Sequence, residues 1–102
     1  MEKFLQDVPE QNYFWVLSGL KLKNLIELSD ALDSMTDEVF NYHVNENKND
    51  FACWIKECIK DLELADTLFT TKSKKDTVKK VRERVIQIQK SKKSAPIQKK
   101  KR

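Results

Sequence analysis

The stretch Asn-Asp-Phe-Ala-Cys-Trp-Ile-Lys-Glu-Cys-Ile at residues 49–59 decides the fold class. Its apolar side chains recur at i, i+3, i+4, i+7 and i+8, the spacing of one face of an amphipathic α-helix: Phe51, Trp54, Ile55, Cys58 and Ile59. Asn49 or Asp50 can cap the first turn of this helix. We therefore predict a helix whose aromatic side chains, Phe51 and Trp54, pack in a core and do not serve as base-stacking platforms.

Four other segments carry helical spacing or helix-start signals. Apolar residues at helical spacing predict a helix over residues 24–35, and Thr36, followed by two acids, starts a second helix that ends before the polar loop at residues 45–49. Asp61 is a candidate cap for a short helix, and Ser73 opens a longer one over residues 72–89. The short helices predict a mainly α fold, a compact bundle of about four helices that share one core.

Residues 13–23 differ from the rest, because they combine a β-rich aromatic run with Gly19, the only glycine of the chain. This pattern predicts a small N-terminal β-hairpin that turns at Ser18 and Gly19, and a continuous helix is the alternative. In the hairpin, Phe14 and Val16 share one face, and the opposite face carries the side chains of Tyr13, Trp15 and Leu17.

Composition limits the class of protein. The chain has 102 residues, of which 35% are charged, with one Gly and two Pro, so we expect one helical domain and no β-sandwich. No apolar run is long enough to span a membrane, and Met1 to Pro9 lacks the features of a secretory signal, so we expect a cytoplasmic protein that does not bind a membrane. Cys53 and Cys58 are expected to be buried, reduced thiols.

The net charge of +4 conceals a strong asymmetry along the chain. Residues 1–71 contain 6 Lys and 14 Asp or Glu, a balance of −8, whereas residues 72–102 contain 14 Lys or Arg and 2 acids, a balance of +12. We divide the chain into an acidic helical body (1–71), a basic amphipathic helix (72–89) and a Lys/Arg tail (90–102). The tail has too few apolar residues to offset its ordering entropy, so we expect it to be disordered when unbound.

Residues 43–55, HVNENKNDFACWI, resemble the HVNxxKNDFxxWI signature of a family of small helical domains of unknown function found in archaea and bacteria. The flanking segments Asp37-Glu-Val-Phe40 and Asp61-Leu-Glu-Leu-Ala65, and the upstream Tyr13-Phe-Trp-Val16, also resemble that family's pattern. The resemblance covers about residues 12–69. It implies a fold but no catalytic residue, ligand or cofactor, and it leaves the basic C-terminal part unexplained.

No catalytic or metal site is predicted. His43, the only histidine, lies at spacings from Cys53 and Cys58 that match no standard zinc pattern, and neither cysteine belongs to a CxxC pair. A chain with one glycine has no glycine-rich phosphate loop, and the acidic residues are scattered. We therefore expect a protein that is not an enzyme, binds no cofactor and has no small-molecule substrate. In the polar loop at residues 45–50, Asn and Asp are expected to satisfy the backbone groups of helix ends.

The basic C-terminal part predicts association with DNA or RNA through phosphate contacts that need no base sequence. The residues expected to make these contacts are the basic side chains of residues 79–102: Lys79, Lys80, Arg82, Arg84, Lys90, Lys92, Lys93, Lys99, Lys100, Lys101 and Arg102. We also expect the tail to be attracted to the acidic body of the same chain, in competition with nucleic acid.

The alternative is a protein-interaction module. Four residues at 3-4-3 spacing form an apolar edge on the C-terminal helix: Val78, Val81, Val85 and Ile88. This edge could dock a partner helix or pair with a second copy of the chain. It could equally pack on the body of its own chain, and the sequence leaves these possibilities open.

Overall fold

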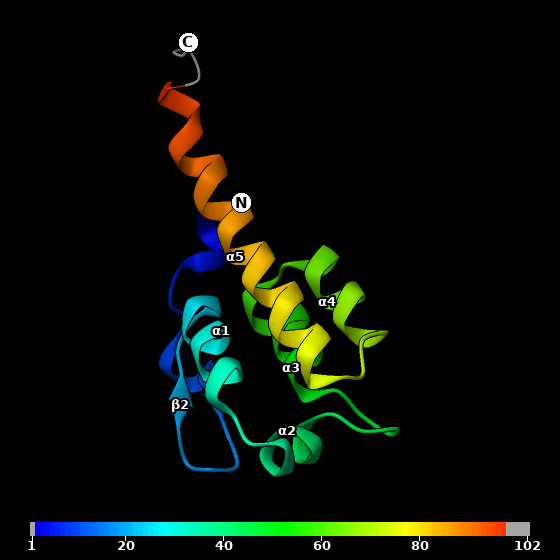
Figure 1. Cartoon of the computed structure of the whole chain (residues 1–102). Helices are drawn as coiled ribbons and strands as arrows, with labels where there is room; N and C mark the ends of the chain where they lie inside the picture. The colour runs from blue at the N-terminus through cyan, green and yellow to red at the C-terminus, as the bar shows by residue number, and fades with distance from the viewer. Residues whose placement is uncertain (1, 98–102) are drawn as a thin grey trace.

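A computed structural model describes the backbone of residues 2–97 and the side chains of residues 2–91. The fold is mainly α, as predicted, and its elements follow in this order: 3₁₀ turns η1 (Glu2–Leu5) and η2 (Glu10–Asn12), strands β1 (Phe14–Trp15) and β2 (Lys21–Leu22), helices α1 (Leu25–Ser34), α2 (Asp37–His43) and α3 (Asp50–Trp54), the π-helical turn η3 (Ile55–Ile59), and helices α4 (Leu62–Phe69) and α5 (Lys74–Ile97). The small hairpin precedes all the α-helices (Figure 1).

The hairpin prediction is confirmed and the alternative of a continuous helix is wrong. β1 and β2 are antiparallel, with Phe14 opposite Leu22 and Trp15 opposite Lys21. Gly19 has φ +99°, a conformation that suits glycine in a tight turn. The predicted alternation also holds, because Phe14 is buried whereas Trp15 is 63% exposed.

Four of the α-helices begin at a cap that the sequence predicted, and Asn24 is a further cap that it did not predict. A side-chain oxygen of the capping residue accepts a hydrogen bond from the backbone N–H three residues later, at 2.8 to 3.2 Å, in every α-helix: Asn24, Thr36, Asn49, Asp61 and Ser73. These caps depend on residues within one turn of each other, which explains why the local sequence predicted four of them.

The core lies between the hairpin and the helices. Its fully buried side chains include Leu25 and Leu28 of α1, Phe51 of α3, Ile55 of η3 and Leu68 of α4. α5 packs against α1, α4 and η1, so it closes one side of the same core (Figure 1). The division into an acidic body and a separate basic helix is therefore a division of charge and not of packing.

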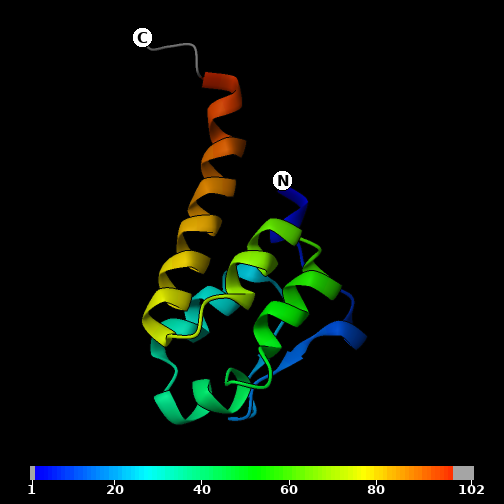
Figure 2. The same cartoon turned by 90° about the vertical axis from the view of Figure 1, so that its right-hand side faces the viewer.

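α5 is longer than predicted. It runs from Lys74 to Ile97, whereas the sequence predicted a helix that ends at residue 89. Residues 90–95 contain no Gly or Pro, and their Lys and Ala residues are good helix formers, so nothing in this segment stops the helix. The C-terminal half of α5 extends beyond the rest of the fold in both views (Figure 2). Residues 98–102 of the predicted disordered tail lie outside the described residues.

The expectation of two buried thiols is wrong, because neither side chain is fully buried. Cys53 is exposed, because it lies off the apolar face that carries Phe51 and Trp54, and Cys58 is half-buried at the margin of the core. Both cysteines are free thiols. Burial, the main cause, raises the pKa of Cys58, and the neighbouring Glu57 raises it further.

Candidate nucleic-acid interface

The apolar edge of α5 is buried in the core of its own chain. Val81 and Ile88 have no exposed surface, Val85 is 7% exposed, and Val78 is half-buried against the core. The structure therefore has this edge packed on the body of its own chain, which is one of the possibilities that the sequence left open. The four residues pack in or against the core of the chain, and the opposite, basic side of the helix is exposed to solvent.

Arg84 was expected to contact phosphates, but the structure shows that its side chain is buried and paired with Asp61. Its side chain is 8% exposed, and its Nε and Nη2 donate hydrogen bonds of 2.7 and 2.9 Å to the carboxylate of Asp61, which is 1% exposed. Hydrogen bonding to Asp61 raises the pKa of Arg84, so the guanidinium stays charged. Arg84 follows the buried edge at helical spacing and faces the cap of α4, where a buried carboxylate needs a partner.

Two other cations fasten α5 to the acidic helices. Arg82 Nη2 lies 2.6 Å from an oxygen of Asp33 in α1, and Lys74 Nζ lies 3.5 Å from Asp37 at the start of α2. Both pairs are at the surface, where solvent weakens them. Arg82 is half exposed and can exchange Asp33 for a phosphate, so it stays in the candidate interface.

The side of α5 opposite the core carries a row of four basic residues and Ile86, with two acids beside it, Asp76 and Glu83. Positions 75, 79, 82, 86 and 90 are 4, 3, 4 and 4 residues apart, which places them within about 80° of the helix circumference. We call this the outer face of α5: Lys75, Lys79, Arg82, Ile86 and Lys90. Within residues 2–91, no ion pair or hydrogen bond is formed by the side chains of Lys75, Lys79, Lys80 and Lys90. Lys80 lies beside this row, toward α4.

Sequence reasoning placed some of these residues and missed one. Lys79, Lys80, Arg82 and Lys90 were predicted and are exposed on α5. Lys75 was not predicted, although its distance of four residues from Lys79 is a signal that would have found it. Lys92 and Lys93 lie in the last turns of α5, where only the backbone is described. The remaining predicted residues are outside the described part of the chain: Lys99, Lys100, Lys101 and Arg102.

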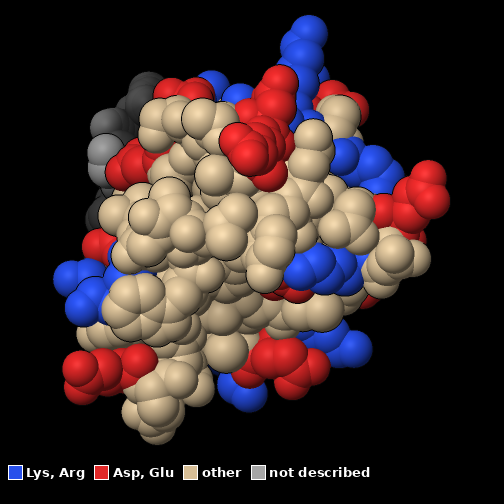
Figure 3. Space-filling view, turned by 90° about the horizontal axis from the view of Figure 1, so that it is seen from below, with Lys and Arg blue, Asp and Glu red and all other residues tan. Residues whose placement is uncertain are grey.

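The underside of the molecule has a different character. Viewed from below, uncharged side chains fill the middle of the surface, and most charged groups lie toward its rim (Figure 3). Trp15, Leu17 and Leu20 of the hairpin and Tyr42 of α2 are each at least half exposed. Lys21 lies 5.8 Å from the ring centre of Trp15.

The family assignment agrees with the fold. A family described as a family of unknown function (DUF5752) matches residues 7–102 of the chain. The chain belongs to this family. The match extends beyond the resemblance over residues 12–69 and includes α5, so the expectation that the basic part lies outside the family is wrong. This agrees with the packing of α5 in the core of the DUF5752 fold. No curated protein and no solved structure matches the chain.

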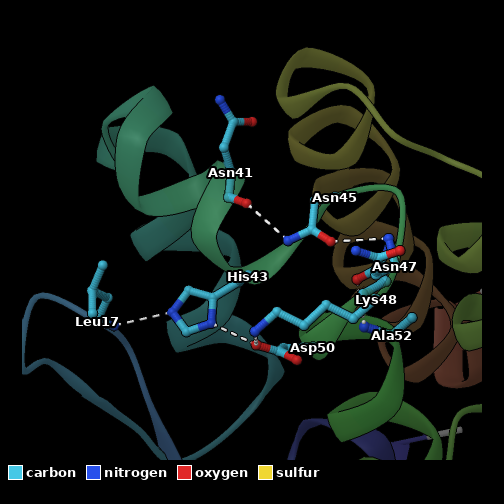
Figure 4. Close-up of polar contacts among 9 residues, drawn as sticks. Leu17, Asn41, His43, Asn45, Asn47, Lys48, Asp50 and Ala52 are labelled. Carbon is cyan, nitrogen blue, oxygen red and sulfur yellow. Dashed lines mark hydrogen bonds and ion pairs between the residues drawn. The ribbon is translucent and has the colours of Figure 1, made fainter.

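His43 holds three parts of this DUF5752 fold together. Its ring is buried, and Nε2 accepts a 3.0 Å hydrogen bond from the backbone N–H of Leu17 in the hairpin loop (Figure 4). Nδ1 lies 2.9 Å from Oδ2 of Asp50, so a neutral ring that accepts at Nε2 donates at Nδ1. Lys48 contacts the same oxygen at 3.0 Å. The geometry is that of a structural histidine that joins the hairpin to α2 and α3.

The polar loop after His43 is stabilised by its own asparagines. Asn45 Nδ2 donates to the carbonyl of Asn41 near the end of α2, and the side-chain oxygen of Asn45 accepts from the N–H of Asn47 (Figure 4). This is the expected use of such residues at helix ends. In the part of the chain that the structure describes, no three His, Cys, Asp or Glu side chains are grouped to hold a metal ion. None of the helices within residues 2–97 has the length and apolar character needed to cross a membrane.

Proposed function

We propose that this chain associates with nucleic acid through phosphate contacts from the outer face of α5 and the basic residues that follow it. The observation that carries the proposal is that Lys75, Lys79 and Lys90 lie on one exposed side of α5, with no acidic partner among the described residues. A lysine in an ion pair must exchange that partner for a phosphate, whereas an unpaired lysine exchanges only water and counterions.

The dimensions of the outer face fit a charged polymer. Lys75 and Lys90 are 15 residues apart, so they are separated by about 22 Å along the helix axis. Duplex DNA carries a negative charge for about every 1.7 Å of its axis, so several phosphates can lie along this length. The contacts would come mainly from lysine ammonium groups on one side of a helix, and contacts from such groups to phosphates carry no base sequence.

Salt dependence gives the sharpest test, because each phosphate contact releases counterions. We would measure binding to duplex DNA and to structured RNA by fluorescence anisotropy between about 50 and 200 mM salt. The variant K75Q/K79Q/K90Q removes three charges from the outer face. The control K3Q/K21Q/K56Q removes three charges from exposed lysines elsewhere on the fold.

The expected change follows from a slope of about −0.9 in log affinity against log salt for each phosphate contact with duplex DNA. If all three lysines contact phosphates, raising the salt from about 50 to 200 mM weakens binding of the native chain about 40-fold more than it weakens binding of the outer-face variant. The control variant should keep most of the native slope. Equal slopes for the two variants would mean that net charge, and not the outer face, governs binding. No binding of the native chain to either nucleic acid would remove the proposal.

Removal of residues 90–102 tests the rest of the basic C-terminus. This truncation leaves the buried residues of α5 in place, so the domain should remain folded. We expect a lower affinity and a shallower salt slope than in the full chain. If neither changes, the contacts are confined to Lys75, Lys79 and Arg82.

A further inference from the structure

The end of α4 and the start of α5 enclose a second basic feature, a hollow of about 380 Å³ at the surface. Three lysines line it: Lys72 from the connection between the helices, and Lys79 and Lys80 from α5. One acid, Asp76, also lies in the lining, which leaves a formal charge of +2. None of these lysines is paired with a described carboxylate, and Lys72 makes a 3.4 Å contact with the carbonyl of Asn45.

Threonines complete the lining and satisfy the carbonyl groups at the end of α4. The hydroxyls of Thr70 and Thr71 donate to the carbonyl of Thr67 at 3.0 and 2.7 Å. The carbonyl of Leu68 accepts from the N–H of Thr71 and from the side-chain amide of Asn49. The carbonyls of Thr67 and Leu68 therefore already accept hydrogen bonds from neighbouring groups. Among the described residues the ammonium groups of Lys79 and Lys80 have no partner, and that of Lys72 has only the carbonyl of Asn45.

We propose that this hollow binds a phosphate group, held by the ammonium groups of Lys72, Lys79 and Lys80. A phosphate monoester carries a charge of about −1.5 to −2 at neutral pH and has three terminal oxygens that accept hydrogen bonds. This charge matches the +2 of the lining, and each ammonium can donate to one oxygen. Arg84 nearby takes no part, since Asp61 holds it. The proposal deepens the proposed function, because Lys79 belongs both to the hollow and to the outer face.

The first experiment uses inorganic pyrophosphate and phosphate as probes of the full-length chain. Binding is measured by isothermal titration calorimetry at low salt for the native chain, for K72Q/K80Q and for the control K75Q/K90Q. Both variants remove two exposed charges, but only the first changes the lining of the hollow. We expect K72Q/K80Q to weaken pyrophosphate binding by about tenfold or more, the effect of losing at least one charge-assisted hydrogen bond, with a much smaller change in the control. Absence of pyrophosphate binding, or equal losses in the two variants, would overturn the proposal.

The second experiment identifies the source of the phosphate. Single-stranded oligonucleotides with a 5′-phosphate or a 5′-hydroxyl are compared on the native chain and on K72Q/K80Q. A preference for the 5′-phosphate that K72Q/K80Q abolishes places the end of a nucleic acid in the hollow. Pyrophosphate binding without such a preference supports the hollow as a site for a free phosphorylated molecule.

The two proposals fail in different ways. If pyrophosphate binds in the hollow and no oligonucleotide binds at all, the phosphate site is supported and the nucleic-acid function is refuted. If oligonucleotides bind with a salt slope set by the outer face, while pyrophosphate does not bind and the 5′-phosphate has no effect, the hollow falls and the function stands. Circular dichroism of each variant confirms that these exposed substitutions leave the fold intact.

Discussion

Substitution of Arg84 by Met should destabilise the domain much more than substitution of an exposed basic residue of α5. Arg84 and Asp61 are almost fully buried, and two hydrogen bonds of 2.7 and 2.9 Å join them. Met retains most of the apolar stem, so the main cost is an uncompensated buried carboxylate. Removal of one partner of a buried ion pair typically costs about 3–5 kcal/mol. We expect the lower end, about 3 kcal/mol, because Asp61 still accepts the N–H of Leu64.

R82M provides a matched control on the same helix. Arg82 also contacts a carboxylate, that of Asp33, at 2.6 Å, but both side chains are at least half exposed. Exposed pairs of this kind contribute about 0–1 kcal/mol. The two substitutions are chemically the same, so the difference between them isolates the effect of burial. For a domain of this size, a loss of about 3 kcal/mol corresponds to a fall in Tm of about 12–24 °C.

Urea unfolding followed by circular dichroism gives the free energy of unfolding of the native chain and of both variants. The double variant D61N/R84M completes the test, because the asparagine side chain that replaces Asp61 would keep an acceptor for the N–H of Leu64 without a buried charge. We expect the loss in its free energy of unfolding to be about 2 kcal/mol smaller than the sum of the losses in the two single variants. If R84M costs less than about 1 kcal/mol, as R82M should, then water solvates Asp61 and this ion pair does not hold α5 to α4.

Three further predictions test the packing. V81D should unfold the domain, because it buries an unpaired carboxylate at a position without exposed surface. Circular dichroism and size-exclusion chromatography check this prediction. If V81D instead converts an oligomer into a folded monomer, the apolar edge docks a partner copy. Iodoacetamide should label Cys53 before Cys58, whose pKa is raised by burial, and mass spectrometry should show that labelling of Cys58 accelerates as the pH is raised. N49A should cost about 2–3 kcal/mol in urea unfolding, because it removes the cap of α3 and a buried hydrogen bond to the carbonyl of Leu68; a cost below about 1 kcal/mol would show that water replaces both bonds.

The features that the sequence predicted well are those that act over short distances. The side chain of a cap such as Thr36 or Ser73 accepts a hydrogen bond from an N–H three residues later, so the two residues that define it stand together in the sequence. The apolar face of residues 51–59 depends on the same local periodicity. The hairpin could be predicted because its turn needs a residue with positive φ, and Gly19 is the only glycine.

The features that the sequence did not predict depend on contacts between distant residues. Arg84 is basic and lies among other basic residues, so composition assigns it to solvent. Its actual partner, Asp61, is 23 residues away and had been recognised only as a helix cap. The packing partner of Val81 was left open for the same reason, since an apolar edge can pack equally on its own chain, on a partner or on a second copy. The hollow at Lys72 and Lys80 likewise arises only when α4 and α5 pack together.

The two sides of α5 explain how one helix can be both the most basic element and part of the core. Val81, Val85 and Ile88 are buried in the core, and the outer face carries its charge on the opposite side, where water screens the repulsion between lysines. A deletion of the whole basic segment would remove these core residues with the lysines. Loss of nucleic-acid binding in such a deletion would then report unfolding and not the loss of phosphate contacts. Charge-neutralising substitutions on the outer face avoid this ambiguity, because they leave the buried side of α5 unchanged.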